Sequence, residues 1–209
     1  MKSKSFTLVL FLCAFSIYGQ TNDSIKAENT FTNLEEALKN PSNVLRLDLS
    51  NQFFDKLPAS IAKFKNLTYL SLKNDHLKEI PKEIASLSKL KTLDLSGNDF
   101  KVLPTDLKKL KNLEEIYLNN EPSADVIQEL SVLSKLPKLK ILHLEDDKMV
   151  VLPKSINNLK HLEKLYLNNN EFTNLPPYIT NNKKLFYIDM KNNPLQWKGE
   201  RPFGITINF

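Results

Sequence analysis

The sequence predicts an α/β solenoid of seven stacked repeats, and three observations lead to that fold class. A segment with three apolar residues in the spacing L-x-x-L-x-L recurs along most of the chain. Its copies begin 23 residues apart, except for one interval of 26 between residues 113 and 139. Five copies are followed, 14 residues after their start, by a proline with an apolar residue before it. Self-similarity at a fixed period of this size indicates a repeat architecture.

Each recurring segment is expected to form one short strand. The copies start at Val44, Leu67, Leu90, Leu113, Leu139, Leu162 and Leu185. Alternate side chains of a strand point to opposite faces, so the apolar residues enter a core and the residues between them face outward. A single repeat cannot bury its apolar face alone, so neighbouring repeats must stack.

A polar residue stands three positions beyond the last apolar residue of each strand. These ladder positions are Gln52, Asp75, Asn98, Glu121, Asp147, Asn170 and Asn193. Asparagine carries both donors and an acceptor, so it can satisfy buried backbone groups on both sides. The three acidic members lack the donor, and we expect weaker links where they stand.

The combined pattern L-x-x-L-x-L-x-x-N-x-F/L-x-x-L-P-x-x-I-x-x-L resembles the leucine-rich-repeat family, in its 23-residue class with Leu-Pro in each unit. The resemblance covers residues 44 to about 195. The resemblance implies a curved solenoid with short parallel strands on the concave face. It also implies a binding role, because members of the family mostly bind proteins or peptides through that face. The apolar leader and the repeat style are similar to those of exported bacterial members.

The convex face is expected to carry irregular or short 3₁₀ segments, because proline fixes φ and removes a backbone donor. Repeat four is the exception, with one helix that accounts for its three extra residues. Ser123 is a suitable N-cap, Asp125 suits the first turn, and Lys135 and Pro137 mark the end of this helix.

The ends of the chain divide into a leader and two caps. Residues 1–19 have a basic start and an apolar stretch too short to span a membrane, which predicts a signal peptide cleaved near Gly19. Residues 20–43 hold an N-terminal segment and a capping helix, with a capping-box pattern from Thr32 to Glu35. Residues 44–195 are the seven repeats. Residues 196–209 form a C-terminal cap in which Trp197, Phe203 and the alternating residues 205–209 are expected to seal the last repeat.

The sequence contains no recognisable catalytic or metal-binding motif, so we expect no enzyme, cofactor or metal site. The single cysteine lies in the leader, and the three histidines fall at different repeat phases. The formal net charge of +5 falls to +3 once the two leader lysines are removed. Many lysines fall between the prolines and the next strands, on the convex side and among acidic residues, and no basic stripe appears on the concave face. This indicates a solvated surface rather than one for nucleic acid.

Aromatic residues gather on the predicted concave face from the fourth repeat onward. The middle outward position of each strand gives Tyr117, His143 and Tyr166, and we expect a contact patch centred on them. Residues expected to contribute beside them are Tyr187, Tyr69, Glu145 and Lys164. Exposed aromatic side chains are enriched at binding hot spots. Tyrosine also favours strands for packing reasons alone, so the pattern has a structural explanation as well.

These observations predict an exported, non-catalytic module, secreted, periplasmic or held at the cell surface, that recognises a protein or peptide. A glycan-binding surface protein is the alternative, because tyrosines beside Asp and Asn also suit sugar stacking. An enzyme would need a catalytic constellation outside the motifs tested. The identity of the partner and the oligomeric state stay open.

Overall fold

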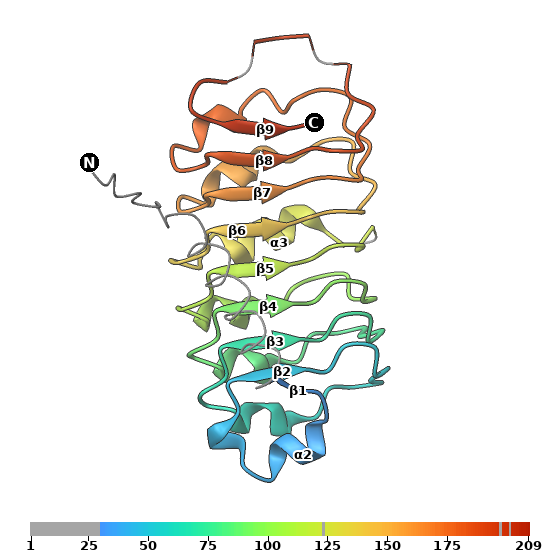
Figure 1. Ribbon diagram of the computed structural model, residues 1–209, viewed down its shortest axis with the longest axis vertical. Helices are drawn as coiled ribbons and strands as arrows, with labels where there is room; N and C mark the ends of the chain where they lie inside the picture. Colours follow the sequence, from blue (N-terminus) through green and yellow to red (C-terminus); the bar gives the residue numbers. More distant parts are fainter. Residues whose placement is uncertain (1–29, 123, 197, 201) are drawn as a thin grey trace, which may run out of the picture. The chain divides into compact units, whose positions relative to one another are not determined.

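The computed structural model describes residues 30–209 except 123, 197 and 201. These residues form one nine-stranded sheet in which the strands follow chain order (Figure 1). The strands are β1 (Thr30–Phe31), β2 (Arg46–Asp48), β3 (Tyr69–Ser71), β4 (Thr92–Asp94), β5 (Glu115–Tyr117), β6 (Ile141–His143), β7 (Lys164–Tyr166), β8 (Tyr187–Asp189) and β9 (Thr206–Asn208). The predicted α/β solenoid is therefore confirmed, with one strand beyond each end of the seven expected.

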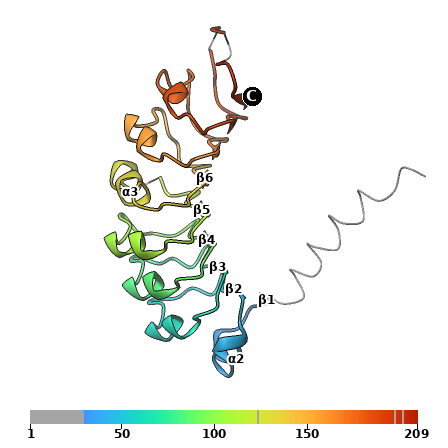
Figure 2. The same cartoon turned by 90° about the vertical axis from the view of Figure 1, so that its left-hand side faces the viewer.

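The strands from β2 to β9 pair in parallel, and the register follows the repeat. Leu47 pairs with Leu70 and Leu70 with Leu93, so the middle residue of each strand meets its equivalent in the next repeat. These leucines are fully buried. Within residues 31–209 the strands line the concave side and the short helices the convex side (Figure 2).

The convex segments are 3₁₀ helices, as the prolines predict. They are η2 (Ala59–Lys63), η3 (Lys82–Ser86), η4 (Thr105–Lys109), η5 (Lys154–Asn158) and η6 (Ile179–Asn181). The first four each begin directly after the repeat's proline, which has extended backbone angles. A residue fixed near φ −65° without an N–H suits this position, where no helical hydrogen bond is lost.

Repeat four has the predicted convex helix, α3 (Val126–Leu133), but its cap differs from the expectation. Asp125 is the N-cap, and its carboxylate accepts hydrogen bonds from the backbone N–H groups of Ile127 and Gln128. Ser123, the predicted cap, lies outside the described residues. The helix therefore begins later than the sequence suggested, because an aspartate one residue before it can bind two of its free N–H groups.

The helix before the first repeat, α2 (Leu34–Leu38), is capped by Asn33 and not by Thr32. Asn33 Oδ1 accepts from the Glu36 backbone N–H at 2.9 Å. Leu34 and Ala37 are buried, and a short 3₁₀ turn, η1 (Pro41–Asn43), leads into the first repeat.

At the other end, the cap differs from the prediction at Phe203 and Phe209, which are both exposed. Ile207 of β9 is buried against the last repeat, whereas Phe203 is fully exposed and seals nothing. Gly204, with φ 78°, directly follows Phe203, and this turn carries the Phe203 ring into solvent. Trp197 and the predicted leader, residues 1–19, lie outside the described residues. No helix of the described residues is long and apolar enough to cross a membrane.

The polar ladder is present, and Asn98 shows how it works. Asn98 Oδ1 accepts from the backbone N–H groups of Asp75 and Leu77, at 3.2 and 3.0 Å. Its Nδ2 donates to the carbonyl oxygens of Leu72 and Leu95, at 2.8 and 2.7 Å. One side chain thus joins two repeats through backbone groups that the strands leave unpaired, as the buried position requires.

The residue before each ladder position has a left-handed backbone. These residues are Asn51, Asn74, Gly97, Asn120, Asp146, Asn169 and Asn192, with φ between 57° and 68°. Glycine, asparagine and aspartate tolerate this conformation far better than other residues do. The left-handed turn therefore explains why asparagine, aspartate or glycine recurs directly before the ladder position in all seven repeats.

Candidate functional site

The outward residues of four consecutive strands bring aromatic rings together on the concave face. In register, Tyr117 of β5 is opposite His143 of β6, and His143 is opposite Tyr166 of β7. Parallel strands lie about 4.8 Å apart, close to the separation of stacked rings. Equivalent positions of successive repeats therefore stack without any distortion of the sheet.

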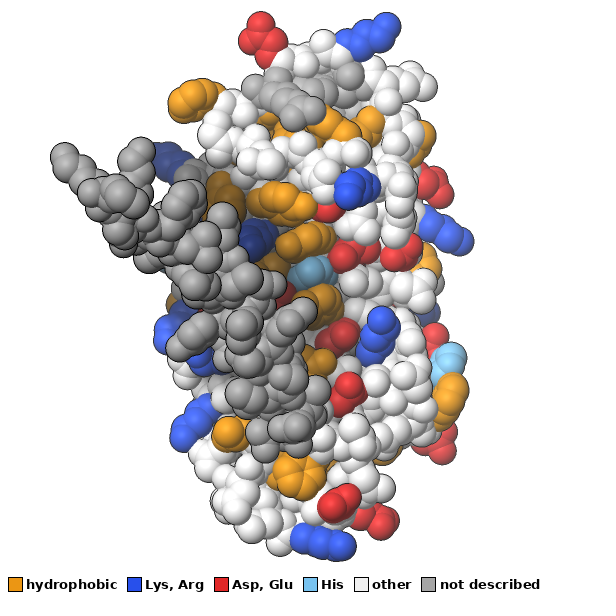
Figure 3. Space-filling model, in the orientation of Figure 1, with side chains coloured by type: hydrophobic (Ala, Val, Ile, Leu, Met, Phe, Trp, Pro, Cys, Tyr) orange, Lys and Arg blue, Asp and Glu red, His pale blue; other side chains and the backbone are white. Residues whose placement is uncertain are grey.

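The rings form a continuous row. The Tyr117 and His143 ring centroids are 3.8 Å apart with 14° between their planes. His143 and Tyr166 are 4.3 Å apart and nearly parallel, at 4°. Tyr187 of β8 continues the row, tilted by 52° at 5.6 Å from Tyr166. We call these four residues the aromatic ledge, and Figure 3 shows hydrophobic side chains gathered on this face over β5–β8.

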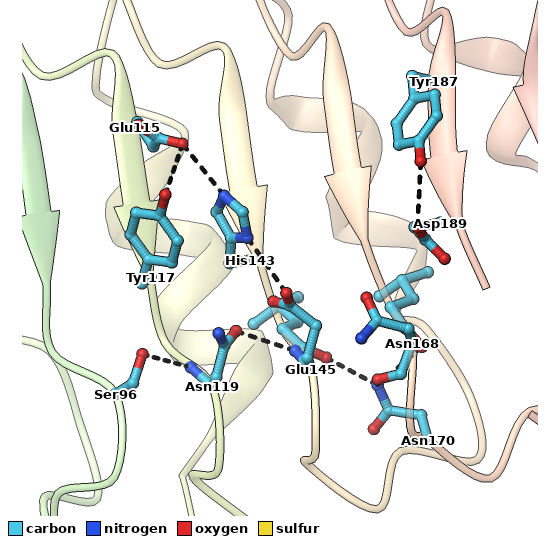
Figure 4. Close-up of polar contacts among 12 residues, drawn as sticks. Ser96, Glu115, Tyr117, Asn119, His143, Glu145, Asn168, Asn170, Tyr187 and Asp189 are labelled. Carbon is cyan, nitrogen blue, oxygen red and sulfur yellow. Dashed lines mark hydrogen bonds and ion pairs between the residues drawn. The ribbon is translucent and has the colours of Figure 1, made fainter. Parts of the chain in front are cut away.

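Besides the rings of Tyr117 and Tyr166, two carboxylates hold His143, those of Glu115 and Glu145 (Figure 4). Its Nε2 lies 3.2 Å from Glu115 Oε1, and its Nδ1 lies 3.3 Å from Glu145 Oε1. Burial by itself lowers the pKa of His143, but the hydrogen bonds to both glutamates and their charges outweigh it, so its pKa is raised. The hydrogen bond from His143 lowers the pKa of Glu115, against the opposing effect of burial. The ring therefore favours the doubly protonated, cationic form.

Carboxylates also orient the tyrosine hydroxyls. Tyr117 donates to Glu115 Oε1 and Tyr187 donates to Asp189 Oδ2, each at 3.0 Å (Figure 4). Burial, followed by the charge of Glu115, raises the pKa of Tyr117. Both hydroxyls thus remain protonated, with their directions fixed before any partner arrives.

The structure groups most, but not all, of the predicted site residues. Tyr117, His143, Tyr166 and Tyr187 form the ledge, and Glu145 is bonded to it through His143. Lys164 lies on β7 between Ile141 and Tyr187 in the register of the first outward column. Tyr69 lies apart on β3, where the Arg46 guanidinium covers its ring at 3.9 Å from the centroid.

Two features of the site escaped sequence reasoning. His143, expected to face solvent, is only 7% exposed because the neighbouring tyrosine rings cover it. Glu115 was not selected, yet it accepts hydrogen bonds from both Tyr117 and His143. Its position two residues before Tyr117, on the same face of one strand, was the available signal.

The arrangement suits non-covalent contact. Among the described residues, no group of three or more His, Cys, Asp or Glu side chains is placed to hold a metal ion. The ring faces largely cover one another, so the ledge presents ring edges and oriented hydroxyls, flanked by carboxylates. Such a surface loses little entropy on binding because its side chains are already fixed.

Comparison with known families agrees with this architecture. Residues 42–137 match the model described as a leucine-rich repeat region, and residues 161–182 match the leucine-rich repeat model. Together these matches cover more than half of the chain. The chain therefore belongs to the leucine-rich-repeat family. No curated protein was similar enough in sequence to count as a match.

Three solved structures illustrate the likeness. A leucine-rich-repeat protein of Leptospira interrogans is 26% identical, with a TM-score of 0.56, over 78% of this chain and 53% of that one. Internalin C2 of Listeria monocytogenes is 25% identical, with a TM-score of 0.59, over 75% of this chain and 65% of that one. The Toll–Spatzle complex of Drosophila has a chain that is 18% identical, with a TM-score of 0.65, over 78% of this chain and 22% of that one, and shows the fold alone.

The chain thus spans about half of the Leptospira protein, under two thirds of internalin C2 and a much smaller part of the chain in the Drosophila complex. Proteins of this family are commonly non-catalytic protein-interaction modules.

Proposed function

We propose that this protein is an exported, non-catalytic module that binds a protein or peptide through its concave face, with the aromatic ledge as the main contact. The observation that carries the proposal is the row of three stacked rings, Tyr117, His143 and Tyr166, which the tilted Tyr187 ring continues. Hydrogen bonds to carboxylates hold Tyr117, His143 and Tyr187 in place. Rigid aromatic side chains on a strand are the residue types that dominate binding energy at protein interfaces.

The extent of the face agrees with a protein ligand. Seven strands, β2–β8, at about 4.8 Å spacing give a surface roughly 29 Å long. A standard protein interface buries about 800 Å² on each partner, which a surface of this length can supply.

Ring orientation favours a protein over a glycan. Sugars stack on free aromatic faces, and in the ledge the faces of Tyr117 and Tyr166 lie against His143. One face of each of these tyrosines is therefore taken up by His143, and their ring edges and hydroxyls suit apolar side chains and backbone polar groups of a polypeptide.

Export is the second part of the proposal. The basic start and short apolar stretch of residues 1–19 support a cleaved leader. Mass spectrometry of the protein recovered from its source culture should find Gln20 at or near the N-terminus. An intact Met1 in the extracellular or envelope fractions would contradict cleavage.

The binding proposal is tested by capture and then by affinity. The full chain is used as bait against extracellular and envelope extracts, and a captured protein is purified and titrated by isothermal calorimetry. The variant with alanine at Tyr117, His143 and Tyr166 should bind it at least about tenfold more weakly. Phe203→Ala, which removes a fully exposed aromatic ring outside the concave face, is the matched control and should bind like the unchanged chain.

Circular dichroism must first show that the triple variant is folded. Unchanged affinity in a folded triple variant would overturn the ledge as the contact. Capture of a polysaccharide in place of a protein, with loss on Tyr166→Ala, would establish the glycan alternative.

A further inference from the structure

A second concavity lies beside helix α3, and it shares no residue with the aromatic ledge. Its volume is about 200 Å³, and it is lined by Glu121, Pro122, Ala124, Val126, Glu129, Leu144, Asp147, Met149 and Val151. The lining residues come from the fourth and fifth repeats, where the 26-residue spacing inserts the helix.

Three of these lining residues are carboxylic acids. Glu121 and Asp147 are ladder residues, and each accepts one backbone N–H: Asn98 donates to Glu121 Oε1 and Glu121 donates to Asp147 Oδ1. Glu129 reaches the cavity from α3. Burial, then the neighbouring acidic charges of Asp147 and Asp125, raises the pKa of Glu129 to about 8.

Glu129 is an independent sign that this cavity can take a cation. Its side chain is only 2% exposed, and its Oε1 is buried without a hydrogen-bond partner among the residues that the structure describes. Among the described residues, no lysine, arginine or histidine forms a salt bridge with Glu121, Glu129 or Asp147. A buried carboxyl without a partner is costly, and folded proteins rarely keep one without a reason.

The walls and rim of the cavity are apolar. Val126, Met149 and Val151 line it, and Val151 is 70% exposed. Ile127 and Val150, the sequence neighbours of these residues, are exposed as well. Exposed aliphatic side chains beside a cavity are typical of a contact with another macromolecule rather than with a free small cation.

We propose that this cavity binds the side chain of a lysine presented by a partner protein, with the ammonium among Glu121, Glu129 and Asp147. The four-carbon stem would lie along Val126, Met149 and Val151, in the way lysine stems cover apolar surface elsewhere. An ammonium is a compact point charge whose three donors need not lie in one plane, so it can bond the unpartnered Glu129 Oε1 while the nearby charges of Glu121 and Asp147 attract it. A guanidinium is a planar fork suited to pairing with one carboxylate, so lysine fits better than arginine.

Binding of the cation changes the protonation of the cavity. In the free protein, burial first and neighbouring acids second raise the pKa of Glu121 to about 9 and that of Asp147 to about 7. A bound ammonium favours the ionised carboxylates, so protons must leave as it enters. Lysine binding near neutral pH should therefore release protons into the buffer.

The first experiment uses n-butylammonium as the probe, on the full chain labelled at its methionine methyl groups. Titration should shift the Met149 methyl resonance to saturation, and calorimetry in two buffers of different ionisation enthalpy should show proton release. N-butylacetamide, which has the same stem without the charge, should produce neither effect. Glu129→Gln should abolish both, whereas Glu171→Gln removes one exposed carboxylate elsewhere and should leave both unchanged.

A second variant guards against a folding defect. Val151 is mostly exposed, so Val151→Ser should keep the fold and weaken butylammonium binding several-fold by removing stem contacts. Equal shifts with butylammonium and N-butylacetamide, or saturable butylammonium binding by folded Glu129→Gln, would overturn the proposal. So would tight calcium binding at the same methyl resonance without any response to butylammonium.

A lysine-containing peptide with apolar neighbours should bind more tightly than butylammonium and lose binding when that lysine is acetylated. Spermine that binds as tightly as every such peptide would indicate a free polyamine and overturn the protein partner. The aromatic-ledge triple variant should bind butylammonium normally, so failure of either proposed site leaves the other independently measurable.

Discussion

The ladder position of this solenoid is occupied in two chemically different ways. At Asn98, a carboxamide accepts two backbone N–H groups and donates to the carbonyls of Leu72 and Leu95. At Glu121 and Asp147, a carboxyl accepts a single ladder N–H in each case, and no hydrogen bond from it to a strand carbonyl is found in the described part of the chain. The ladder side chain therefore both donates and accepts hydrogen bonds at Asn98, which is a two-way link. At Glu121 and Asp147 it only accepts, which is a one-way link.

The difference shows that the solenoid tolerates fewer ladder hydrogen bonds beside the inserted helix α3. Glu121 and Asp147 stand on either side of α3, which replaces a 3₁₀ segment, and both line a cavity with Glu129 of that helix. The third acidic ladder residue, Asp75, lies in a repeat that keeps its 3₁₀ helix. The stacking of buried leucines continues through these repeats unchanged. Packing thus maintains the solenoid while the polar groups of this region become available for another purpose.

The largest effect is expected where the two-way link is removed. Asn98→Ala leaves two buried N–H groups and two buried carbonyls without their partner, and each such group costs about 1–3 kcal/mol. The free energy of unfolding should fall by roughly 4 kcal/mol in urea denaturation, since part of the loss is relieved by relaxation. Asn66→Ala, which removes two exposed hydrogen bonds, one donated to Ser42 and one accepted from Lys89, is the control and should cost under about 1 kcal/mol. Equal losses would contradict the special role of the ladder.

A change of pH tests the acidic region next. Burial and mutual repulsion raise the pKa values of Glu121, Glu129 and Asp147 to about 9, 8 and 7, from their ordinary values of 4.5, 4.5 and 3.8. The folded state therefore binds more protons than the unfolded chain between pH 4 and 9, so stability falls as pH rises through that window. We expect the urea midpoint to fall steadily as the pH is raised from 5 to 9.

Glu129→Gln removes one of the three titrating groups and should flatten that pH dependence. The charge-matched control Glu171→Gln, at an exposed site, should leave the slope unchanged. A full-length chain whose stability rises steadily from pH 5 to pH 9 would contradict the raised pKa values.

A smaller effect is expected when the amide rung is converted into an acidic one. Asn98→Asp keeps the acceptor for Asp75 and Leu77 but loses the donor to Leu72 and Leu95. It also places another carboxyl beside Glu121. The free energy of unfolding at pH 6 should fall by about 2 kcal/mol, less than for alanine. A loss as large as that of Asn98→Ala would show that the donor carries nearly all the stabilisation.

The smallest expected effect is an increase in the free energy of unfolding. Asp147→Asn should restore a donor at the acidic rung, by analogy with Asn170, which donates to Leu144 and Leu167. We expect a stabilisation of about 1 kcal/mol at pH 7, measured as a higher urea midpoint with an unchanged slope. Destabilisation would mean that the acidic rung is already the better partner for its surroundings.

The stacked repeats, their register and the ladder were predictable because they depend on spacing alone. Once Leu47 and Leu70 are 23 residues apart in identical contexts, stacking aligns them and fixes their neighbours as well. The aromatic row could be anticipated for the same reason, since Tyr117, His143 and Tyr166 hold equivalent positions.

Other features were not predictable because they depend on which side-chain atoms meet. Asn33 and Asp125 cap their helices because of local backbone geometry, which composition did not distinguish from capping by Thr32 or Ser123. The exposure of Phe203 follows from the path of the turn at Gly204.

The sequence by itself determined the repeat, the face on which each residue lies and the acidic ladder positions of repeats four and five. Only the tertiary structure decided that His143 lies buried between two tyrosines with a carboxylate at each nitrogen, and that Glu129 points into a cavity without a partner. The physical reason is that periodicity assigns a residue to a surface, whereas burial, stacking and ionisation depend on distances of a few ångströms between side chains far apart in the chain.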